Sequence, residues 1–358
     1  MKNNQAIPFN KENFKQIFSF AFVLMILISV PSALIADYFN IPLAWFLGPM
    51  LATSIASLLG LKIRTPRLIL SAILILLGLY IGNYIDKELF SQIHEWLFTS
   101  IIMLFYIIFS ILIVSKYLQK FSDYEKKTSI FSAAPGALGP LMILAEDEQK
   151  TDLSHVATAH LIRLIIIITV FPFVVYSFYE TSSVKLTQEI IQDQSWLDLV
   201  VLIFFSIILI YFFDKLGLPA ALLSGTLIAS GVLQITELAS YKFSPNLIDY
   251  CLLILGASVG CRFADKTFGE IGKNAFHSFI ATLLLVILGV VAAIVASLII
   301  DKNFFTLLLS YCPGGIYEVA VIAIFFDLDP EFVSFHHIIR LLMILFVVPI
   351  ILRFLKKT

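Results

Sequence analysis

Two pairs of basic residues stand out because they lie inside strongly apolar sequence. His160 precedes Arg163 by three positions, and His337 precedes Arg340 in the same way. Residues three apart share one face of a helix. An arginine inside an apolar helix is costly, so it is expected to serve a solute, an ion or a buried partner. Histidine can exchange a proton near neutral pH, because its unperturbed pKa is about 6.5.

Three roles stay open for Arg163 and Arg340. They can contact an anionic solute or ion, or satisfy carbonyl groups that a broken helix has freed. The long side chain can also snorkel to the membrane surface.

A helix break precedes each pair: Pro135-Gly136 in the first case and Pro313-Gly314-Gly315 in the second. Proline lacks an amide hydrogen, and glycine accepts backbone angles that other residues avoid, so these residues interrupt a helix. At membrane depth the freed backbone groups must be buried in protein or line a cavity. Amide hydrogens at the start of a half-helix suit an anion. Both breaks are therefore candidate solute sites, and a kink used only for packing is the other interpretation.

Glu318 is the acidic residue nearest to a break, five positions after Pro313. A carboxylate near a helix N-terminus is favoured electrostatically, so capping is one interpretation and coupling to a proton or cation is the other. Pro140 holds the matching place in the first half, so the two halves are not chemically equivalent. Asp152 and Asp329 precede the two arginine-bearing helices, and we expect them to act as N-terminal caps.

These residues belong to an internal duplication. Arg163 and Arg340 are 177 positions apart, and the two Pro-Gly pairs are 178 apart. The following pairs extend the match: Pro42 with Pro219, Gly48 with Gly225, Gly78-x3-Gly82 with Gly256-x3-Gly260, and Pro172 with Pro349. The Gly-x3-Gly motifs are expected to let helices pack closely. We therefore divide the chain into a first membrane repeat (1–178), a polar connector (179–195) and a second membrane repeat (196–358).

The composition indicates an all-α polytopic membrane protein, because 59% of the residues are hydrophobic and only 14% are charged. Ten apolar stretches approach the roughly 20 residues of a spanning helix. They are 17–36, 43–60, 68–85, 97–115, 155–178, 196–213, 218–235, 247–264, 275–300 and 333–352. The first stretch has a counterpart in the second half, which favours a retained anchor over a cleaved signal peptide.

The positions of Lys and Arg favour Pro-Gly segments that turn back, rather than cross, because this arrangement leaves more of these residues on the cytoplasmic side. Five crossings per half, an odd number, would make the repeats inverted relative to each other. The predicted fold is therefore about ten transmembrane helices plus two broken or re-entrant Pro-Gly segments.

Several site types are missing from the sequence. It has no Gly-rich phosphate loop with its lysine, no nucleophile elbow and no His/Cys cluster at metal spacing. We expect no enzymatic activity, no cofactor and no metal. The net charge of −1 and the lack of a basic stripe give no sign of a nucleic-acid partner. Cys251, Cys261 and Cys312 lie in or beside apolar stretches and are expected to be small core residues.

The motifs resemble the AbrB family of bacterial inner-membrane proteins, which carry an internal duplication. The shared pattern is Pro-Gly-Ala/Gly, an aspartate, and then Arg-Leu in a long apolar helix ending in proline, twice over about 17 to 353. The resemblance implies a multi-pass protein of the bacterial inner membrane. Family labels include regulator of gene expression and ammonia monooxygenase. No DNA-contacting element or ligand cluster here supports either label. The family's glutamate after Pro-Gly-Gly matches Glu318, and Pro140 departs from it.

We expect secondary transport of a small, anionic solute across the bilayer. Arg163 and Arg340 would hold the anion, with the backbone of the two Pro-Gly segments completing its coordination. Glu318, with His160 or His337, would couple a proton or cation. The alternative is a membrane-embedded regulator or sensor that affects gene expression indirectly. The sequence leaves open whether the chain forms a homo-oligomer.

Overall fold

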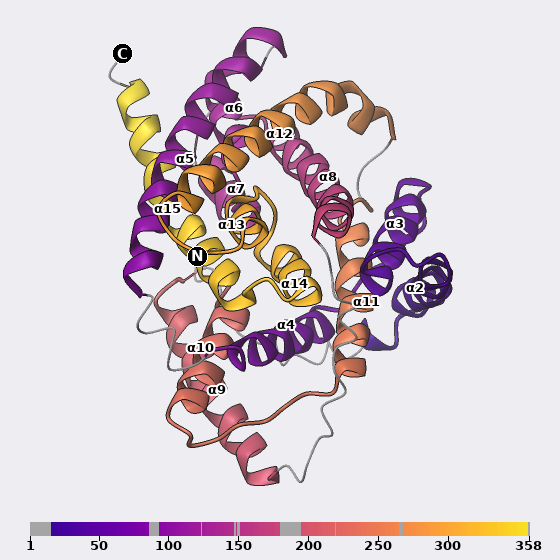
Figure 1. Ribbon diagram of the computed structural model, residues 1–358. Helices are drawn as coiled ribbons and strands as arrows, with labels where there is room; N and C mark the ends of the chain where they lie inside the picture. The colour runs from indigo at the N-terminus through magenta and orange to yellow at the C-terminus, as the bar shows by residue number, and fades with distance from the viewer. Residues whose placement is uncertain are drawn as a thin grey trace. The chain divides into compact units, whose positions relative to one another are not determined.

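The computed structural model describes residues 16–85, 93–122, 124–146, 148, 151–179, 195–218, 220–264 and 268–356. Within them every regular element is a helix (Figure 1), which confirms the all-α prediction. Six helices are long and apolar enough to span a bilayer. They are α2 (Phe20–Tyr38), α5 (Ile93–Phe121), α8 (Leu153–Phe178), α9 (Trp196–Lys215), α12 (Phe268–Ser297) and α15 (Pro330–Lys356). The chain is a helical, multi-pass membrane protein.

Eight shorter helices complete the described fold. Four contain 15 to 17 residues: α3 (Ala44–Leu58), α4 (Arg67–Gly82), α10 (Ala221–Ile235) and α11 (Pro245–Cys261). Four are shorter still: α6 (Lys126–Ala133), α7 (Leu138–Glu146), α13 (Phe304–Tyr311) and α14 (Ile316–Phe326). Each of the ten predicted apolar stretches overlaps a described helix. Helices of 15 to 17 residues reach only about 22–26 Å, short of a core about 30 Å thick, so the count of ten crossings stays a prediction.

The helices fall into two compact units, and each unit takes helices from both halves of the sequence. The first unit consists of residues 1–89 and 180–268, and the second of residues 90–179 and 269–358. A compact unit is therefore not the same thing as a sequence repeat. The division at the connector, 179–195, stays a prediction about repeats.

In the first unit, helices from different halves pack in pairs: α3 on α11, and α4 on α10. The two Gly-x3-Gly motifs lie in these pairs. A Cβ added at Gly82 would lie 2.6 Å from the carbonyl oxygen of Leu227, and one at Gly260 would lie 2.7 Å from that of Met50. Only a residue without a side chain fits such approaches of two backbones, so the predicted packing role is confirmed.

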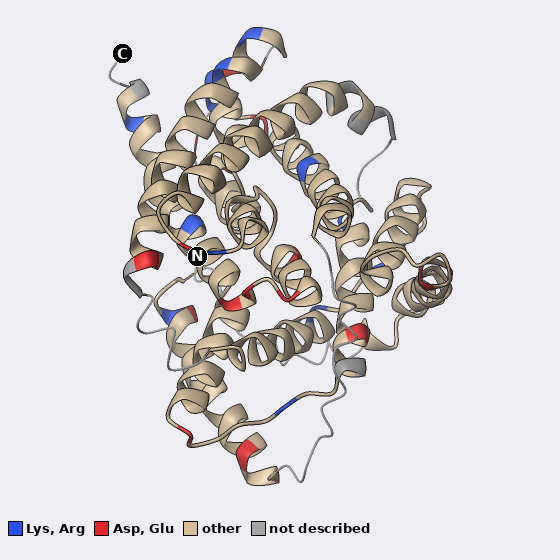
Figure 2. Cartoon of the chain, viewed as in Figure 1, with Lys and Arg blue, Asp and Glu red and all other residues tan. Residues whose placement is uncertain are grey.

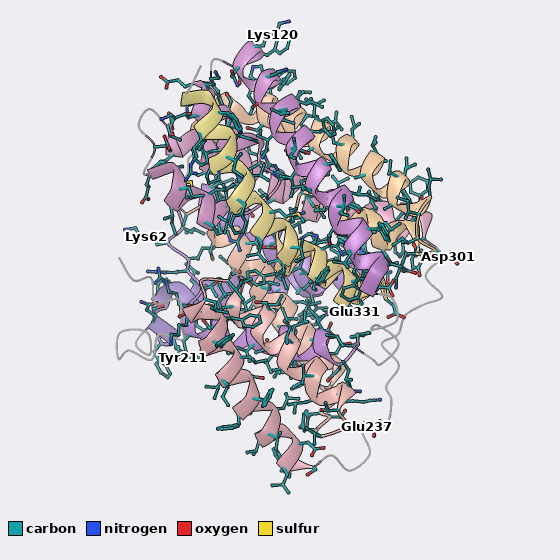
Figure 3. All side chains as sticks on the ribbon, turned by 90° about the vertical axis from the view of Figure 1, so that its left-hand side faces the viewer. Lys62, Lys120, Tyr211, Glu237, Asp301 and Glu331 are labelled. Atoms are coloured by element: carbon teal, nitrogen blue, oxygen red, sulfur yellow. The ribbon has the colours of Figure 1, made fainter. Side chains whose placement is uncertain are left out.

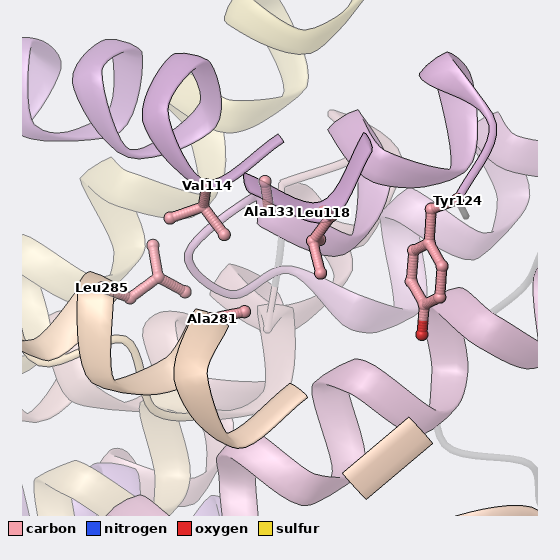
Figure 4. Packing of buried hydrophobic residues seen from close by; sticks show 6 residues of the cluster. All are labelled: Val114, Leu118, Tyr124, Ala133, Ala281 and Leu285. Carbon is pink, nitrogen blue, oxygen red and sulfur yellow. The ribbon is translucent and has the colours of Figure 1, made fainter. Parts of the chain in front are cut away.

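The second unit contains both Pro-Gly segments and both arginine-bearing helices. A buried cluster joins α5, α6 and α12 (Figure 4). Its members are Val114, Leu118, Tyr124, Ala133, Ala281 and Leu285. Because lipid tails are as apolar as these side chains, close packing rather than escape from water holds such helices together. The cluster fixes α6, the helix that leads to the first Pro-Gly pair.

Candidate functional site

The first Pro-Gly pair lies at the tip of a helical hairpin formed by α6 and α7. At its base, Lys127 Nζ lies 2.6 Å from Glu148 Oε2, and the backbone N–H of Asp152 donates to the hydroxyl of Thr128 at 3.0 Å. The end of α7 has thus returned to the start of α6. We call this segment, residues 126–146, hairpin 1.

Arg163 binds the backbone at the tip of hairpin 1. Its Nη1 donates to the carbonyl oxygen of Ala134 and its Nη2 to that of Ser132, both at 2.5 Å. These carbonyls end α6, where the helix leaves acceptors unsatisfied and carries the negative end of its dipole. Arg163 therefore satisfies backbone groups freed by the break.

His160 lies beside Arg163 and faces the same tip. Its Nε2 is 3.2 Å from the carbonyl oxygen of Gly136, and its Nδ1 is 3.0 Å from that of Val156. A neutral imidazole carries one N–H and can donate to only one of these carbonyls, whereas an imidazolium can donate to both.

The second Pro-Gly segment lies at the tip of a matching hairpin formed by α13 and α14. At its base, the Thr306 hydroxyl donates to Asp329 Oδ2 at 3.2 Å, and Lys302 Nζ is 3.5 Å from Asp329 Oδ1. We call residues 304–326 hairpin 2. The carboxylate of Asp329 thus joins the base of the hairpin, and its role as the cap of α15 stays a prediction.

Arg340 binds the tip of hairpin 2 as Arg163 binds the tip of hairpin 1. It donates to the carbonyl oxygens of Cys312 and, at 2.6 Å, of Gly314. Its Nη2 also lies 3.0 Å from His337 Nδ1, and His337 Nε2 lies 3.0 Å from the carbonyl oxygen of Leu309. This network assigns His337 the neutral form, with Nδ1 accepting from the guanidinium and Nε2 donating to the carbonyl.

The two tips and the two arginines lie together within the second unit. A Cβ added at Gly136 would lie 3.2 Å from Arg340 Nη2 and 3.4 Å from its Nε, so hairpin 1 faces the arginine of the other half. Gly136 also has φ +119°, a conformation that favours glycine. A Cβ added at Gly314 would lie 3.1 Å from the side chain of Ile167 in α8. Residues predicted separately in each half thus lie close together.

Among the described residues, neither of the two arginines is paired with a carboxylate. Charged residues are sparse along the helices (Figure 2). Arg163 and Arg340 are 2% and 1% exposed, and their charges act on each other. Within the described part of the chain neither forms an ion pair, and the Nε of each is buried without an acceptor. Because an uncompensated buried charge is costly, this arrangement favours an anion.

Glu318 lies in the first turn of α14. Gly315 is the N-cap of this helix, and Glu318 lies three positions later, buried at 1% exposure. Its carboxylate folds back over Gly315, where an added Cβ would lie 2.8 Å from Cδ and 3.3 Å from Oε1. A carboxylate at this position is typical of helix capping. Both roles of Glu318, capping of α14 and coupling of a proton or cation, stay predictions.

Asp152 caps α8, as predicted, because its Oδ1 accepts a hydrogen bond from the backbone N–H of His155 at 3.0 Å. Partial burial raises the pKa of this carboxyl, but the hydrogen bonds from His155 outweigh burial and the pKa is lowered from its ordinary value. Lys127 and Lys302, which join the hairpin bases, were not predicted from the sequence. A lysine close before each Pro-Gly segment was the signal that could have indicated them.

Most of the chain is similar to a known protein family. A family model described as "Transition state regulatory protein AbrB" matches residues 45–356, a range that contains both hairpins and both arginine-bearing helices. The chain belongs to the AbrB family. The resemblance predicted from the Pro-Gly and arginine motifs is thereby confirmed.

Two relatives show how far the AbrB-family likeness extends. "Putative regulator AbrB" of Escherichia coli (strain K12) is 26% identical over 329 residues, covering 88% of this chain and 91% of the relative. "Uncharacterized protein YhjN" of Bacillus subtilis (strain 168) is 21% identical over 293 residues, covering 76% and 75%. No solved structure matches this chain.

Proposed function

We propose that this AbrB-family protein is a secondary transporter that moves a small anionic solute across the bacterial inner membrane. The observation that carries the proposal is the meeting of two helix breaks with two buried arginines that have no carboxylate partner among the described residues. Discontinuous helices that present half-helix ends and fixed positive charge are how many transporters hold an anion.

The arginines would act in two ways. Their terminal nitrogens hold the carbonyls that end α6 and α13, so they position the tips. Their charge makes the surroundings of Pro135-Gly136 and Pro313–Gly315 positive, and the anion would bind to amide hydrogens and the remaining Nε–H groups there.

Inverted repeats would place this site near the middle of the bilayer. Within the second unit, Lys120 at the end of α5 and Asp301 after the matching α12 lie toward opposite ends (Figure 3). Hairpins 1 and 2 follow these residues, so they would enter from opposite membrane faces. The first arms, α6 and α13, have eight residues each and are about 12 Å long, a little less than half of a core about 30 Å thick. Two such arms from opposite faces would therefore bring both tips near the middle of the bilayer.

Reciprocal contacts in the first unit support the same duplication. The Thr53 hydroxyl donates to the carbonyl oxygen of Ala257, and the Ser230 hydroxyl donates to that of Leu79. Ser230 lies 177 positions after Thr53, and Ala257 lies 178 positions after Leu79, so each contact is the counterpart of the other. Two compact units, each containing helices of both halves, suit transport by motion of one helix group against the other.

His160 is a better candidate than His337 for proton coupling. Both ring nitrogens of His160 face carbonyl oxygens, so a second proton would gain an acceptor. A second proton on His337 would replace the lone pair that accepts from Arg340. Glu318 would contribute through its charge at the start of α14.

Uptake by purified protein in liposomes tests the proposal. Vesicles would be given inward gradients of labelled acetate, phosphate or sulfate, with and without a pH gradient. Gradient-dependent accumulation that is lost in Arg340→Gln is the expected result. Saturable anion binding without accumulation would instead support the alternative, a membrane-embedded sensor. Full uptake by correctly folded Arg163→Gln and Arg340→Gln would refute the site.

A further inference from the structure

The two hairpins differ at the position where each second arm begins. In hairpin 2 this position is closed, because the carboxylate of Glu318 folds back on Gly315, the N-cap of α14. In hairpin 1 the matching residues are Pro140 and Ala137, and no carboxylate is present there. One hairpin therefore supplies its own anion and the other does not.

The first turn of α7 has amide hydrogens to offer. Ala137 is its N-cap in effect, because the Ala137 carbonyl oxygen accepts from the N–H of Leu141 at 2.9 Å. The N–H groups of Leu138 and Gly139 come too early in the helix for an intrahelical acceptor. A Cβ added at Gly139 would meet no atom of the described residues within 4 Å, and Gly139 is exposed, so the described part of the chain leaves room beside these amides.

Arg340 adds an independent sign of a ligand at this tip. The residue is 1% exposed, its Nε–H has no acceptor in the described part of the chain, and its Nε is 3.4 Å from the Cβ position of Gly136. Its two terminal nitrogens are already used by hairpin 2. The buried Nε–H of the Arg340 guanidinium thus faces the tip of hairpin 1 without an acceptor among the described residues. A buried donor without an acceptor is costly, so it indicates an absent partner.

We propose that the solute is a carboxylate monoanion, bound at the tip of hairpin 1 by the first amides of α7 and the Nε–H of Arg340. Glu318 is its tethered counterpart in hairpin 2, because its carboxylate lies over Gly315 at the matching helix start. This inference rests on the proposed function, because it names the class of anion and the half of the site that binds it.

Binding of labelled acetate to the full chain in lipid nanodiscs tests the inference, because acetate has the same carboxylate group as the Glu318 side chain. Pro140→Glu places a tethered carboxylate at the position that matches Glu318, while Pro140→Gln adds a neutral side chain of the same size. Glutamate suits the first turn of a helix, so both variants should fold. Gly139→Asp and Gly139→Asn form a second matched pair in open space.

The acidic variant of each pair should bind acetate at least about tenfold more weakly than its neutral partner, because its own carboxylate competes for the amides. Equal acetate affinity within both pairs would overturn the inference, as would a wild-type chain that binds no acetate. The transport proposal fails separately. Transport is refuted if liposomes that contain the wild-type protein accumulate no anion, even when acetate affinity differs between the members of each pair.

Discussion

Replacing Gly136 by alanine should destabilise the protein by forcing strain into the tip of hairpin 1. Gly136 has φ +119°, and an alanine held in such a conformation costs about 1–3 kcal/mol. The new Cβ would also lie 3.2 Å from Arg340 Nη2, the nitrogen that donates to the Gly314 carbonyl. If Arg340 moves aside, that buried carbonyl loses its donor at a further cost of about 1–3 kcal/mol.

Gly139→Ala is the matched control in the same hairpin. Gly139 is not in the positive-φ region, and an added Cβ meets no atom of the described residues within 4 Å. Alanine in a helix is favoured over glycine by up to about 1 kcal/mol, so this variant should be as stable as the wild type or slightly more stable.

Unfolding of both variants in mixed micelles, with increasing amounts of a denaturing detergent and detection by circular dichroism, gives the two changes in free energy. Loss of stability in Gly136→Ala alone is the expected result. If the two variants unfold within about 0.5 kcal/mol of each other, the reasoning from backbone angle and Arg340 contact is refuted.

Three further predictions concern topology, capping and the arginine. With the native cysteines replaced, a single cysteine at Asp301 should react with an impermeant thiol reagent in intact cells and one at Lys120 should not; equal labelling would refute inverted repeats. Asp152→Ala should cost about 1 kcal/mol through loss of the α8 cap. Because folding lowers the pKa of Asp152, the carboxylate stabilises the fold fully above its unfolded pKa, about 3.9, and this stabilisation is lost as pH falls through the folded pKa. The difference in melting temperature between variant and wild type should therefore shrink in acid. Arg163→Lys should speed amide hydrogen exchange in residues 129–138, since one ammonium cannot hold two carbonyls as a guanidinium does; unchanged exchange would contradict the positioning role.

Helices and close glycine contacts could be predicted from the sequence because their signals are local. Long apolar stretches and Gly-x3-Gly spacing each depend on nearby residues. The site was harder to predict. Its residues were named, but three roles stayed open for Arg163, because nothing near it in the sequence shows that its partners are Ser132 and Ala134.

The approach of Gly136 to Arg340 joins elements about 200 positions apart, and sequence from one chain gives no register for such a contact. The role of Glu318 was open for another reason. The same carboxylate suits a helix start or a proton, and only its fold back over Gly315 favours the first.

The contact between Gly136 and Arg340 also bears on how the protein is made. The tip of hairpin 1 is synthesised early, while the arginine that faces it belongs to the last helix of the described chain. Contacts between residues so distant in sequence form late, because a long loop must close first. During translation, hairpin 1 would lack this partner until α15 enters the membrane. Truncation before α15 should therefore leave an inserted but incomplete second unit, which is a natural target for membrane quality control.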